Sequence, residues 1–370
     1  YSAGINCIFT GIWFLLECCL LIVEKKMTFT QFIRTSIRYI FSMILGIMIS
    51  AILFLPTIGA LTNGPRGSLS FMELLNFSFV GNILSTIPKY SYGAHSKLGF
   101  AALFCGGLAI VLALSVFFNK QIKLRVKVVL GCFLFIILLC LYWYPLYLAF
   151  SLFKFVGSYN YRYSYIAEFF ILFLATYNCI CLEEKKNIYT TCSIAIIFSV
   201  LNIILTRSYT HQEKIYAYLT VFMILILTTI YVTSQLVIIK KSKKILLVLL
   251  LIVGSTDLGI NASLLANSLC MNDLSYQSYR KNQENIIKEI QNDDNSNYRI
   301  TQTSNRYMYE GNLTANYDEP LSYGYNSISG YTSSPDGSQL NFLNKCGYPI
   351  YADCLTVVNT SILGIDSLLG

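Results

Sequence analysis

The stretch KKSKKILLVLLLIVGSTDLGINA, residues 240–262, decides the fold class of this chain. It opens on a cluster of lysines, continues as an apolar run, and carries a single acidic residue, Asp257, near its far end. About 20 apolar residues in a helix cross the ~30 Å hydrocarbon core of a bilayer. We therefore expect a membrane-spanning helix over residues 245–260 that begins at the cytoplasmic surface, where basic residues accumulate.

Comparable apolar runs fill the rest of the first 262 residues. The chain is 55% hydrophobic and only 12% charged, whereas a soluble domain carries about 25% charged residues. The runs must be helices, because lipid offers no partner for exposed backbone polar groups, and the period-2 alternation of a membrane barrel is absent. We predict a polytopic α-helical membrane protein with about eight spans, at residues 4–23, 37–58, 98–118, 128–149, 163–182, 188–206, 215–239 and 245–260.

The basic residues predict the orientation of these spans. One set of four short connections holds fourteen lysines and arginines, and the opposite set holds seven in longer connections. The more basic set is expected in the cytoplasm. The last span then delivers the remainder of the chain to the outside. We expect a transmembrane domain at residues 1–262 and an extracytoplasmic, tyrosine-rich domain at residues 263–370.

The exported part reads as an α+β or mostly β domain. Residues 273–292 show the pattern of one amphipathic helix, and short stretches from Tyr298 onward, punctuated by Gly, Ser and Asn, read as strands and turns. Its eleven tyrosines either stack on sugar rings or reflect the preference of strands for tyrosine. Cys346 and Cys354 are close enough in sequence to form a small disulfide loop in an oxidising compartment.

The long external loop at residues 59–97 contains a further predicted element. Residues 69–77 read as a short amphipathic helix at the bilayer surface. Two interpretations stay open, a packing element between spans and a functional helix that faces lipid.

Several function classes are excluded by composition and motif. The net charge of +8 comes from basic residues scattered in loops, where they act as topology signals, so no nucleic acid is expected as a partner. Nine of the twelve cysteines lie in apolar spans, and with two histidines no zinc spacing occurs, so we predict neither a metal nor a cofactor. The phosphate-binding, dinucleotide-binding and hydrolase motifs of soluble enzymes are absent.

Both ends of the chain read as cuts. The sequence opens on Tyr1 almost inside an apolar segment and stops at Gly370 without the composition of a natural end. We therefore expect a piece of a longer protein.

Ionisable residues at the membrane are the natural candidates for a site, because charge at a helix centre is costly. Arg162, at the outer start of a span, either holds a lipid phosphate through its planar fork of donors or snorkels to the interface. Lys89, His95 and Lys97 form a second basic group. Glu168 lies just inside the outer membrane edge.

Two further carboxylates are expected to have structural roles. Glu17, in the first span, reads as a buried or snorkelling group. Asp257 is expected to cap the outer end of its helix or to orient Arg162.

Five short strings, in order along nearly the whole chain, resemble the YfhO family of bacterial membrane proteins. They are LPT at 55–57, YRYS at 161–164, DLGINA at 257–262, YGYNSIS at 323–329 followed by a serine pair, and DSLLG at 366–370. The resemblance implies a GT-C type glycosyltransferase in the bacterial plasma membrane. It also implies a polyprenyl-phosphate-linked sugar as donor and an envelope polymer such as lipoteichoic acid as acceptor.

The resemblance implies roles for individual residues. The departing lipid phosphate would be held by Arg162, with Lys89 and Lys97 in reserve, and Asn160, Tyr161 and Tyr163 would contact the acceptor or the sugar. The catalytic carboxylate of such enzymes usually lies in the first external loop, before the first residue of this chain. The carboxylates considered at the reaction level here are therefore Glu73 and Glu168.

Two rival functions stay open at this point. A flippase or transporter of a lipid-linked sugar would also need many spans, although the paired interrupted helices of transporters are absent. A noncatalytic envelope assembly protein would use the tyrosine-rich domain as a binding module.

Overall fold

The computed structural model describes residues 2–63, 75–93, 101–151, 161–180, 188–269, 274–293, 298–300, 319–327, 330–331, 337–348 and 355–356. The chain divides into two compact units. Residues 1–36 and 70–271 form the first, which we call the helical unit, and residues 37–69 and 272–370 form the second, the tail unit.

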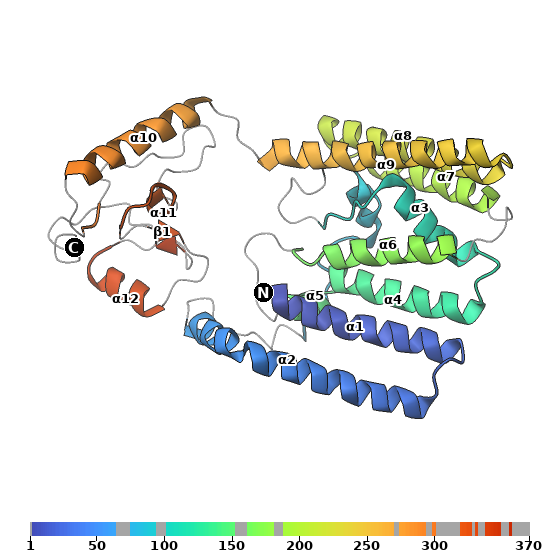
Figure 1. Cartoon of the computed structure of the whole chain (residues 1–370), viewed down its shortest axis with the longest axis horizontal. Coiled ribbons are helices and arrows are strands. Elements are labelled where there is room, and N and C mark those ends of the chain that lie inside the picture. The colour runs from blue at the N-terminus through green and yellow to red at the C-terminus, as the bar shows by residue number, and fades with distance from the viewer. Residues whose placement is uncertain are drawn as a thin grey trace. The chain divides into compact units, whose positions relative to one another are not determined.

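The helical unit is a bundle of apolar helices that run side by side (Figure 1). Its helices are α1 (Ser2–Val23), α3 (Gly107–Ser115), α4 (Leu124–Tyr142), α5 (Tyr144–Phe150), α6 (Tyr165–Ile180), α7 (Ile188–Leu205), α8 (His211–Leu236) and α9 (Lys240–Leu269). Short 3-10 turns, η2 (Ile83–Thr86), η3 (Pro88–Tyr90) and η5 (Val116–Phe118), lie in the connections. The short helix α3 packs against α6, α7, α8 and α9, so it occupies the centre of this unit.

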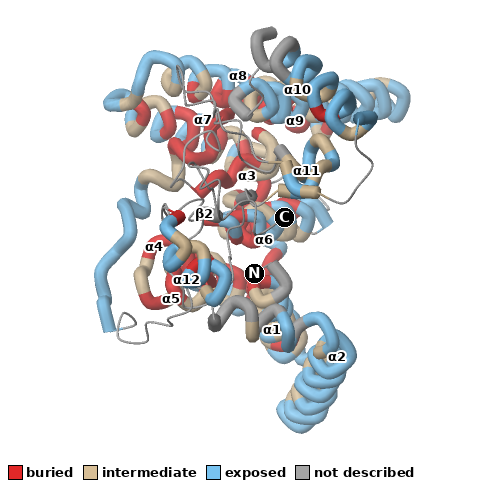
Figure 2. The backbone as a smooth tube through the Cα atoms, turned by 90° about the vertical axis from the view of Figure 1, so that its left-hand side faces the viewer, coloured by how far each residue is buried: buried red, intermediate tan, exposed pale blue. Residues whose placement is uncertain are grey.

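Helix α2 (Phe29–Asn63) joins the two units and is longer than the predicted span at 37–58. None of the residues in its most apolar window is buried, and Figure 2 shows it exposed along most of its length, whereas buried residues gather on α3, α4 and α7. An exposed, apolar helix of this length is what a bilayer accommodates.

The prediction of a polytopic helical membrane protein is confirmed. Within the described part of the chain, six helices are long and apolar enough to cross a membrane, namely residues 4–23 of α1, 29–53 of α2, all of α4, α7 and α8, and 240–267 of α9. Two shorter apolar helices, Gly107–Phe118 and Tyr165–Ile180, fall where the predictions placed spans at 98–118 and 163–182. The count of eight spans stays a prediction.

Two predicted spans are wrong in detail. Residues 101–106 of the span at 98–118 are not helical. Gly106 has a φ of +115°, which a residue with a Cβ rarely adopts, and residues 101–104 are fully buried. Irregular backbone at membrane depth is tolerated where protein covers it, as here.

The span predicted at 128–149 is broken in the middle. Helix α4 ends at Tyr142, Trp143 is extended, and α5 begins with Pro145 in its first turn. In a continuous helix Pro145 would clash with the carbonyl four residues before it, whereas the first turn of a new helix tolerates it. The connection that contains residues 75–93 pairs with this break, with Val80 N donating to Tyr142 O at 2.8 Å and Tyr144 N to Ser78 O at 3.0 Å.

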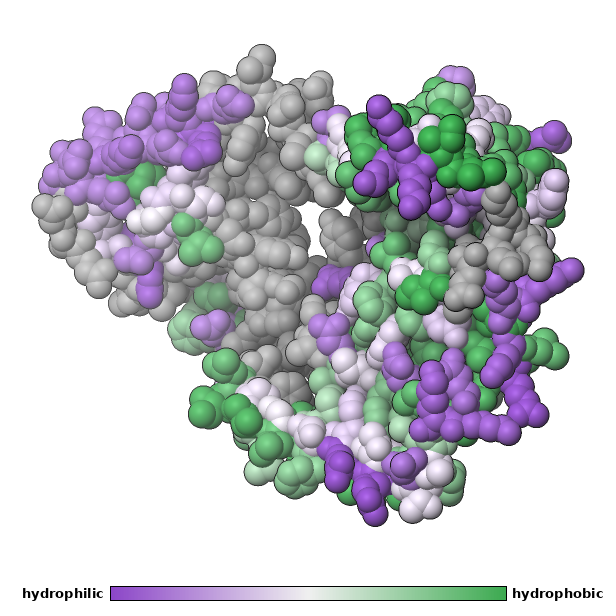
Figure 3. All heavy atoms as spheres, turned by 45° about the vertical axis from the view of Figure 1, so that its right-hand side comes forward, coloured by the Kyte–Doolittle hydropathy of each residue, from purple (hydrophilic) through white to green (hydrophobic). Residues whose placement is uncertain are grey.

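The basic connections lie together at one end of the helical unit. The end of α1, the start of α4 and the start of α9 all lie at the right-hand end in Figure 1. Figure 3 shows hydrophilic residues gathered over this end beside hydrophobic helix surface. This arrangement agrees with one charged membrane face formed by Lys25, Lys26, Lys120, Lys123, Arg125, Lys240, Lys241, Lys243 and Lys244, all exposed.

The tail unit is mainly helical where the structure describes it. The helix predicted at 273–292 is confirmed as α10 (Leu274–Asp293), and two short helices follow, α11 (Glu319–Tyr323) and α12 (Gly337–Lys345). The described strands are β1 (Gly330–Tyr331) and β2 (Leu355–Thr356), paired antiparallel. A mostly β domain is therefore not supported by these residues, in which Tyr298 also lies outside any strand.

Two predictions fall largely outside the described residues. Most of the expected surface helix at 69–77 lies outside them, as does Cys354 of the expected disulfide. Both stay predictions.

Candidate functional site

The connection at residues 75–93 carries Lys89 into the interior of the helical unit. Lys89 sits in the turn η3, between Pro88 and Tyr90, and all three residues are buried. Its Nζ lies 5.0 Å from the centre of the Tyr142 ring and 5.7 Å from the centre of the Tyr161 ring. Because aromatic faces attract cations within about 6 Å, both rings can stabilise the ammonium.

Burial dominates the electrostatics of this group. Removal from water lowers the pKa of Lys89, because desolvation penalises the charged form. Burial, together with a smaller contribution from the neighbouring Tyr147 and Tyr142 hydroxyls, raises the pKa of Tyr161 to about 12. Tyr161 is therefore neutral at physiological pH and offers Lys89 a ring face rather than a negative charge.

An aromatic cluster fixes the other wall of this site. The Tyr147 ring lies 5.6 Å from that of Tyr161, and the Phe150 ring lies 5.3 Å from that of Tyr163. The Tyr163 hydroxyl donates a hydrogen bond of 2.8 Å to the Cys140 carbonyl. These contacts hold residues 161–164 against α4 and α5, so the break at Trp143 is what brings the aromatic residues of α5 to the site.

Arg162 lies within this fixed segment. Its side chain is exposed, while Tyr161 and Tyr163 on either side are buried. Tyr161 thus links the two predicted phosphate-binding residues, because its ring contacts Lys89 and its backbone continues into Arg162. The structure therefore brings Lys89 to the ring of Tyr161, in the segment that also carries Arg162 and Tyr163, from a distant part of the sequence.

Two of the three predicted glutamates, Glu168 and Glu17, lie among the described residues. Glu168 is half-buried in the first turn of α6, within electrostatic range of Cys105, whose Sγ lies 3.4 Å from the Tyr90 hydroxyl. Glu17 is exposed midway along α1. Glu73, His95, Lys97 and Asn160 lie outside the described residues.

One of the two structural roles expected of Asp257 is wrong. Helix α9 continues to Leu269, so Asp257 does not cap the end of this helix. The buried carboxylate instead accepts a hydrogen bond of 2.7 Å from the Gly107 backbone N–H, and one from the Tyr92 hydroxyl. Sequence reasoning missed Tyr92 and Tyr142, and it had no signal for them beyond tyrosines at membrane edges.

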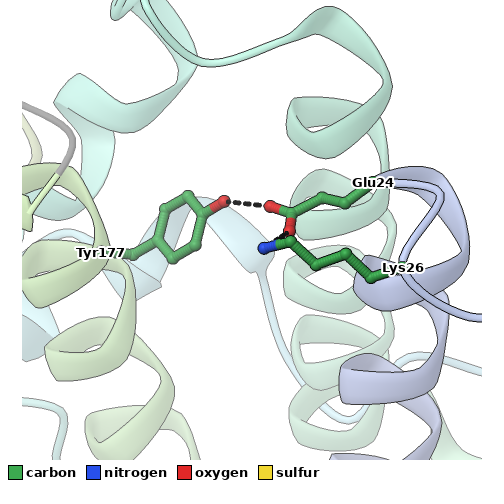
Figure 4. A network of polar contacts seen from close by, with 3 residues as sticks. All are labelled: Glu24, Lys26 and Tyr177. Atoms are coloured by element: carbon green, nitrogen blue, oxygen red, sulfur yellow. Dashed lines mark hydrogen bonds and ion pairs between the residues drawn. The ribbon is translucent and has the colours of Figure 1, made fainter.

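A separate polar group lies at the other end of the helices (Figure 4). Lys26 Nζ is 2.6 Å from Glu24, and the Tyr177 hydroxyl donates to Glu24 at 3.4 Å. This group ties the end of α1 to α6. An ion pair exposed to this extent contributes about 0–1 kcal/mol, so we assign it a structural role.

The chemistry available at Lys89 is anion binding. A buried ammonium beside neutral rings, with an exposed guanidinium on the residue after Tyr161, suits an anionic group such as a phosphate. Among the described residues no group of His, Cys, Asp and Glu could hold a metal ion.

Comparison with known proteins gives one match. A family model described as "Bacterial membrane protein YfhO" matches residues 1–370. No curated protein and no solved structure matches the chain.

Proposed function

Because the chain belongs to the YfhO family of bacterial membrane proteins, we propose that it is part of a membrane glycosyltransferase of the GT-C type. It transfers a sugar from a polyprenyl-phosphate donor to an extracytoplasmic envelope polymer such as lipoteichoic acid. The observation that carries the proposal is the buried Lys89 beside the rings of Tyr142 and Tyr161, because Tyr161 directly precedes the exposed Arg162 in the sequence.

The site matches the electrostatic demand of this reaction. The acceptor hydroxyl attacks the anomeric carbon, the bond from that carbon to the phosphate oxygen breaks, and polyprenyl phosphate departs with one more negative charge. Cations fixed in a water-poor site stabilise charge that grows in the transition state. Arg162 holds the phosphate through two donors, and Lys89 adds a second positive charge.

A carboxylate takes the proton of the acceptor hydroxyl. Glu168 is our candidate among the described residues, because it lies on the helix that follows the Arg162 segment. The tyrosines of that segment, Tyr161 and Tyr163, provide apolar ring surface for the sugar or the acceptor.

The proposal places the protein in the bacterial plasma membrane. The basic loops face the cytoplasm and residues 263–370 lie outside, where envelope polymers are found. The tail then lies on the same side as Arg162.

The test is sugar transfer by the full-length protein in proteoliposomes. Radiolabelled sugar on a polyprenyl-phosphate donor should appear in purified lipoteichoic acid. Arg162→Ala should lower kcat/KM about 10- to 100-fold, the effect of losing a charge-assisted hydrogen bond. Arg207→Ala, at another exposed arginine in a connection between apolar helices, is the matched control and should have little effect.

Two results would overturn the proposal. Transfer that is unchanged in Arg162→Ala rejects the phosphate role of Arg162. Movement of the donor across the bilayer without label in the polymer rejects the enzyme and favours a flippase.

A further inference from the structure

The segment that carries Lys89, residues 87–93, has little regular structure of its own. Its short turn is closed by two backbone hydrogen bonds, Tyr90 N to Ile87 O at 3.1 Å and Ser91 N to Pro88 O at 3.0 Å. The segment ends at Gly93, whose φ of +66° lies in the left-handed region. So few local bonds leave the segment dependent on its surroundings for a defined position.

Three helices supply those surroundings through polar side chains. From α7, the Asn202 amide donates 3.1 Å to Ile87 O and lies 3.3 Å from Ser91 Oγ. From α8, Thr220 Oγ1 accepts from Tyr92 N at 3.0 Å. Hydrogen bonds from α7 and α8 therefore hold the residues before and after Lys89.

Helix α9 provides the third anchor. Asn261 Oδ1 accepts from Gly93 N at 3.0 Å, and Asp257 accepts from the Tyr92 hydroxyl. Asp257 and Asn261 are four residues apart, so they lie on one face of α9. The Tyr90 hydroxyl makes a further bond of 2.6 Å to Gly106 O.

Burying these polar side chains in membrane helices is energetically unfavourable. Asn202 and Thr220 are fully buried, Asp257 is 1% exposed and Asn261 8%. A carboxylate near a helix centre costs about 2.5–3.5 kcal/mol on insertion scales. A loop that only connects two spans can lie at the surface, where water satisfies its backbone groups. The free-energy cost of burying these polar side chains therefore indicates that residues 87–93 need a defined position.

We infer that Asn202, Thr220, Asp257 and Asn261 form a clamp that fixes residues 87–93 and thereby positions Lys89 between its two rings. They are positioning residues, because they bond to residues 87–93 around Lys89 and act on the phosphate only through the placement of Lys89. A cation held in place before the reaction needs no reorganisation when charge develops. That the clamp serves phosphate binding rests on the proposed function. That it fixes the position of Lys89 does not depend on that function.

The experiment measures how fast Lys89 reacts with an amine reagent, acetic anhydride, in the full-length protein in nanodiscs. Peptide mass spectrometry reads the modification at Lys89 alone. Asp257→Asn should accelerate it about tenfold, the effect of weakening one hydrogen bond of about 1.4 kcal/mol. Tyr92→Phe, which removes only the hydroxyl, should do the same, and the double variant should not exceed the larger single effect.

A matched control separates positioning from general loss of stability. Asn178→Ala, in α6, removes an equally buried amide that bonds to Asn119 at 2.9 Å and to Leu112 O at 3.0 Å. It should lower Tm without changing the modification rate at Lys89.

Two outcomes would overturn the clamp. One is an unchanged rate in both Asp257→Asn and Tyr92→Phe, and the other is equal acceleration in Asn178→Ala. Because the labelling needs no sugar donor, failure of the transfer assay leaves the clamp standing. Conversely, intact transfer with an unchanged labelling rate in these variants rejects the clamp alone.

Discussion

Lys89 is a single residue whose burial is unfavourable, which indicates that its charge has a function. Its ammonium is removed from water, and burial lowers its pKa from the ordinary value of 10.5. Ring faces return about 0.5–2 kcal/mol of cation–π attraction, which offsets part of the desolvation. A methionine would fill the same space at no such cost, so the charge itself has a use.

Replacement of Lys89 tests this conclusion through stability. Between the lowered pKa of the folded state and 10.5, the unfolded chain binds more protons than the folded one. Wild-type stability therefore rises with pH through this window, and Lys89→Met should lack that rise. At pH 7 the variant should be at least as stable as wild type by thermal unfolding in detergent.

The control for this prediction is Lys214→Met, at the start of α8, which should show no gain at pH 7. A Lys89→Met protein less stable than wild type by more than about 1 kcal/mol would contradict the account. It would mean that the ammonium stabilises the fold rather than serving the site.

Among the helices, α3 and α8 approach each other closely at Gly107 of α3. A Cβ on Gly107 would lie 3.1 Å from Ile224 Cγ1 and 3.3 Å from the Ile224 backbone. Gly107→Ala should therefore lower the free energy of unfolding by about 1–3 kcal/mol, the usual cost of overpacking. Denaturant titration followed by tryptophan fluorescence measures this.

Gly254 offers the matched control in α9. A Cβ there meets nothing within 4 Å, so Gly254→Ala should stabilise the helix by up to about 1 kcal/mol. Equal effects of the two substitutions would show that α3 and α8 are not packed as closely as described.

Hydropathy predicted where the helices lie, because a membrane span is a continuous run of about 20 apolar residues and is visible in the local sequence. It did not predict the irregular residues 101–106 or the break at Trp143. The first depends on Gly106, and the second depends on Pro145 and on the connection that pairs with the break. The proximity of Lys89 to Tyr142 and Tyr161 is a long-range contact, for which the sequence carried no signal.

Orientation is a property of the whole molecule, and labelling in intact cells tests it. In a background without native cysteines, Lys243→Cys and Lys288→Cys place single thiols at exposed positions of α9 and α10. A membrane-impermeant maleimide should label only Lys288→Cys, because the proposed topology puts residues 263–370 outside. Labelling of Lys243→Cys alone would reverse the predicted topology.

The most direct test of the central claim is equilibrium binding of undecaprenyl phosphate to the full-length protein in nanodiscs, with undecaprenol as the uncharged comparison. We expect the phosphate to bind about 10- to 100-fold more tightly than the alcohol, a preference worth about 1.4–2.8 kcal/mol. Lys89→Met should remove most of this preference, and Lys214→Met should retain it. Equal affinity for the two lipids in the wild-type protein would contradict the account, because the buried cation would then recognise no phosphate.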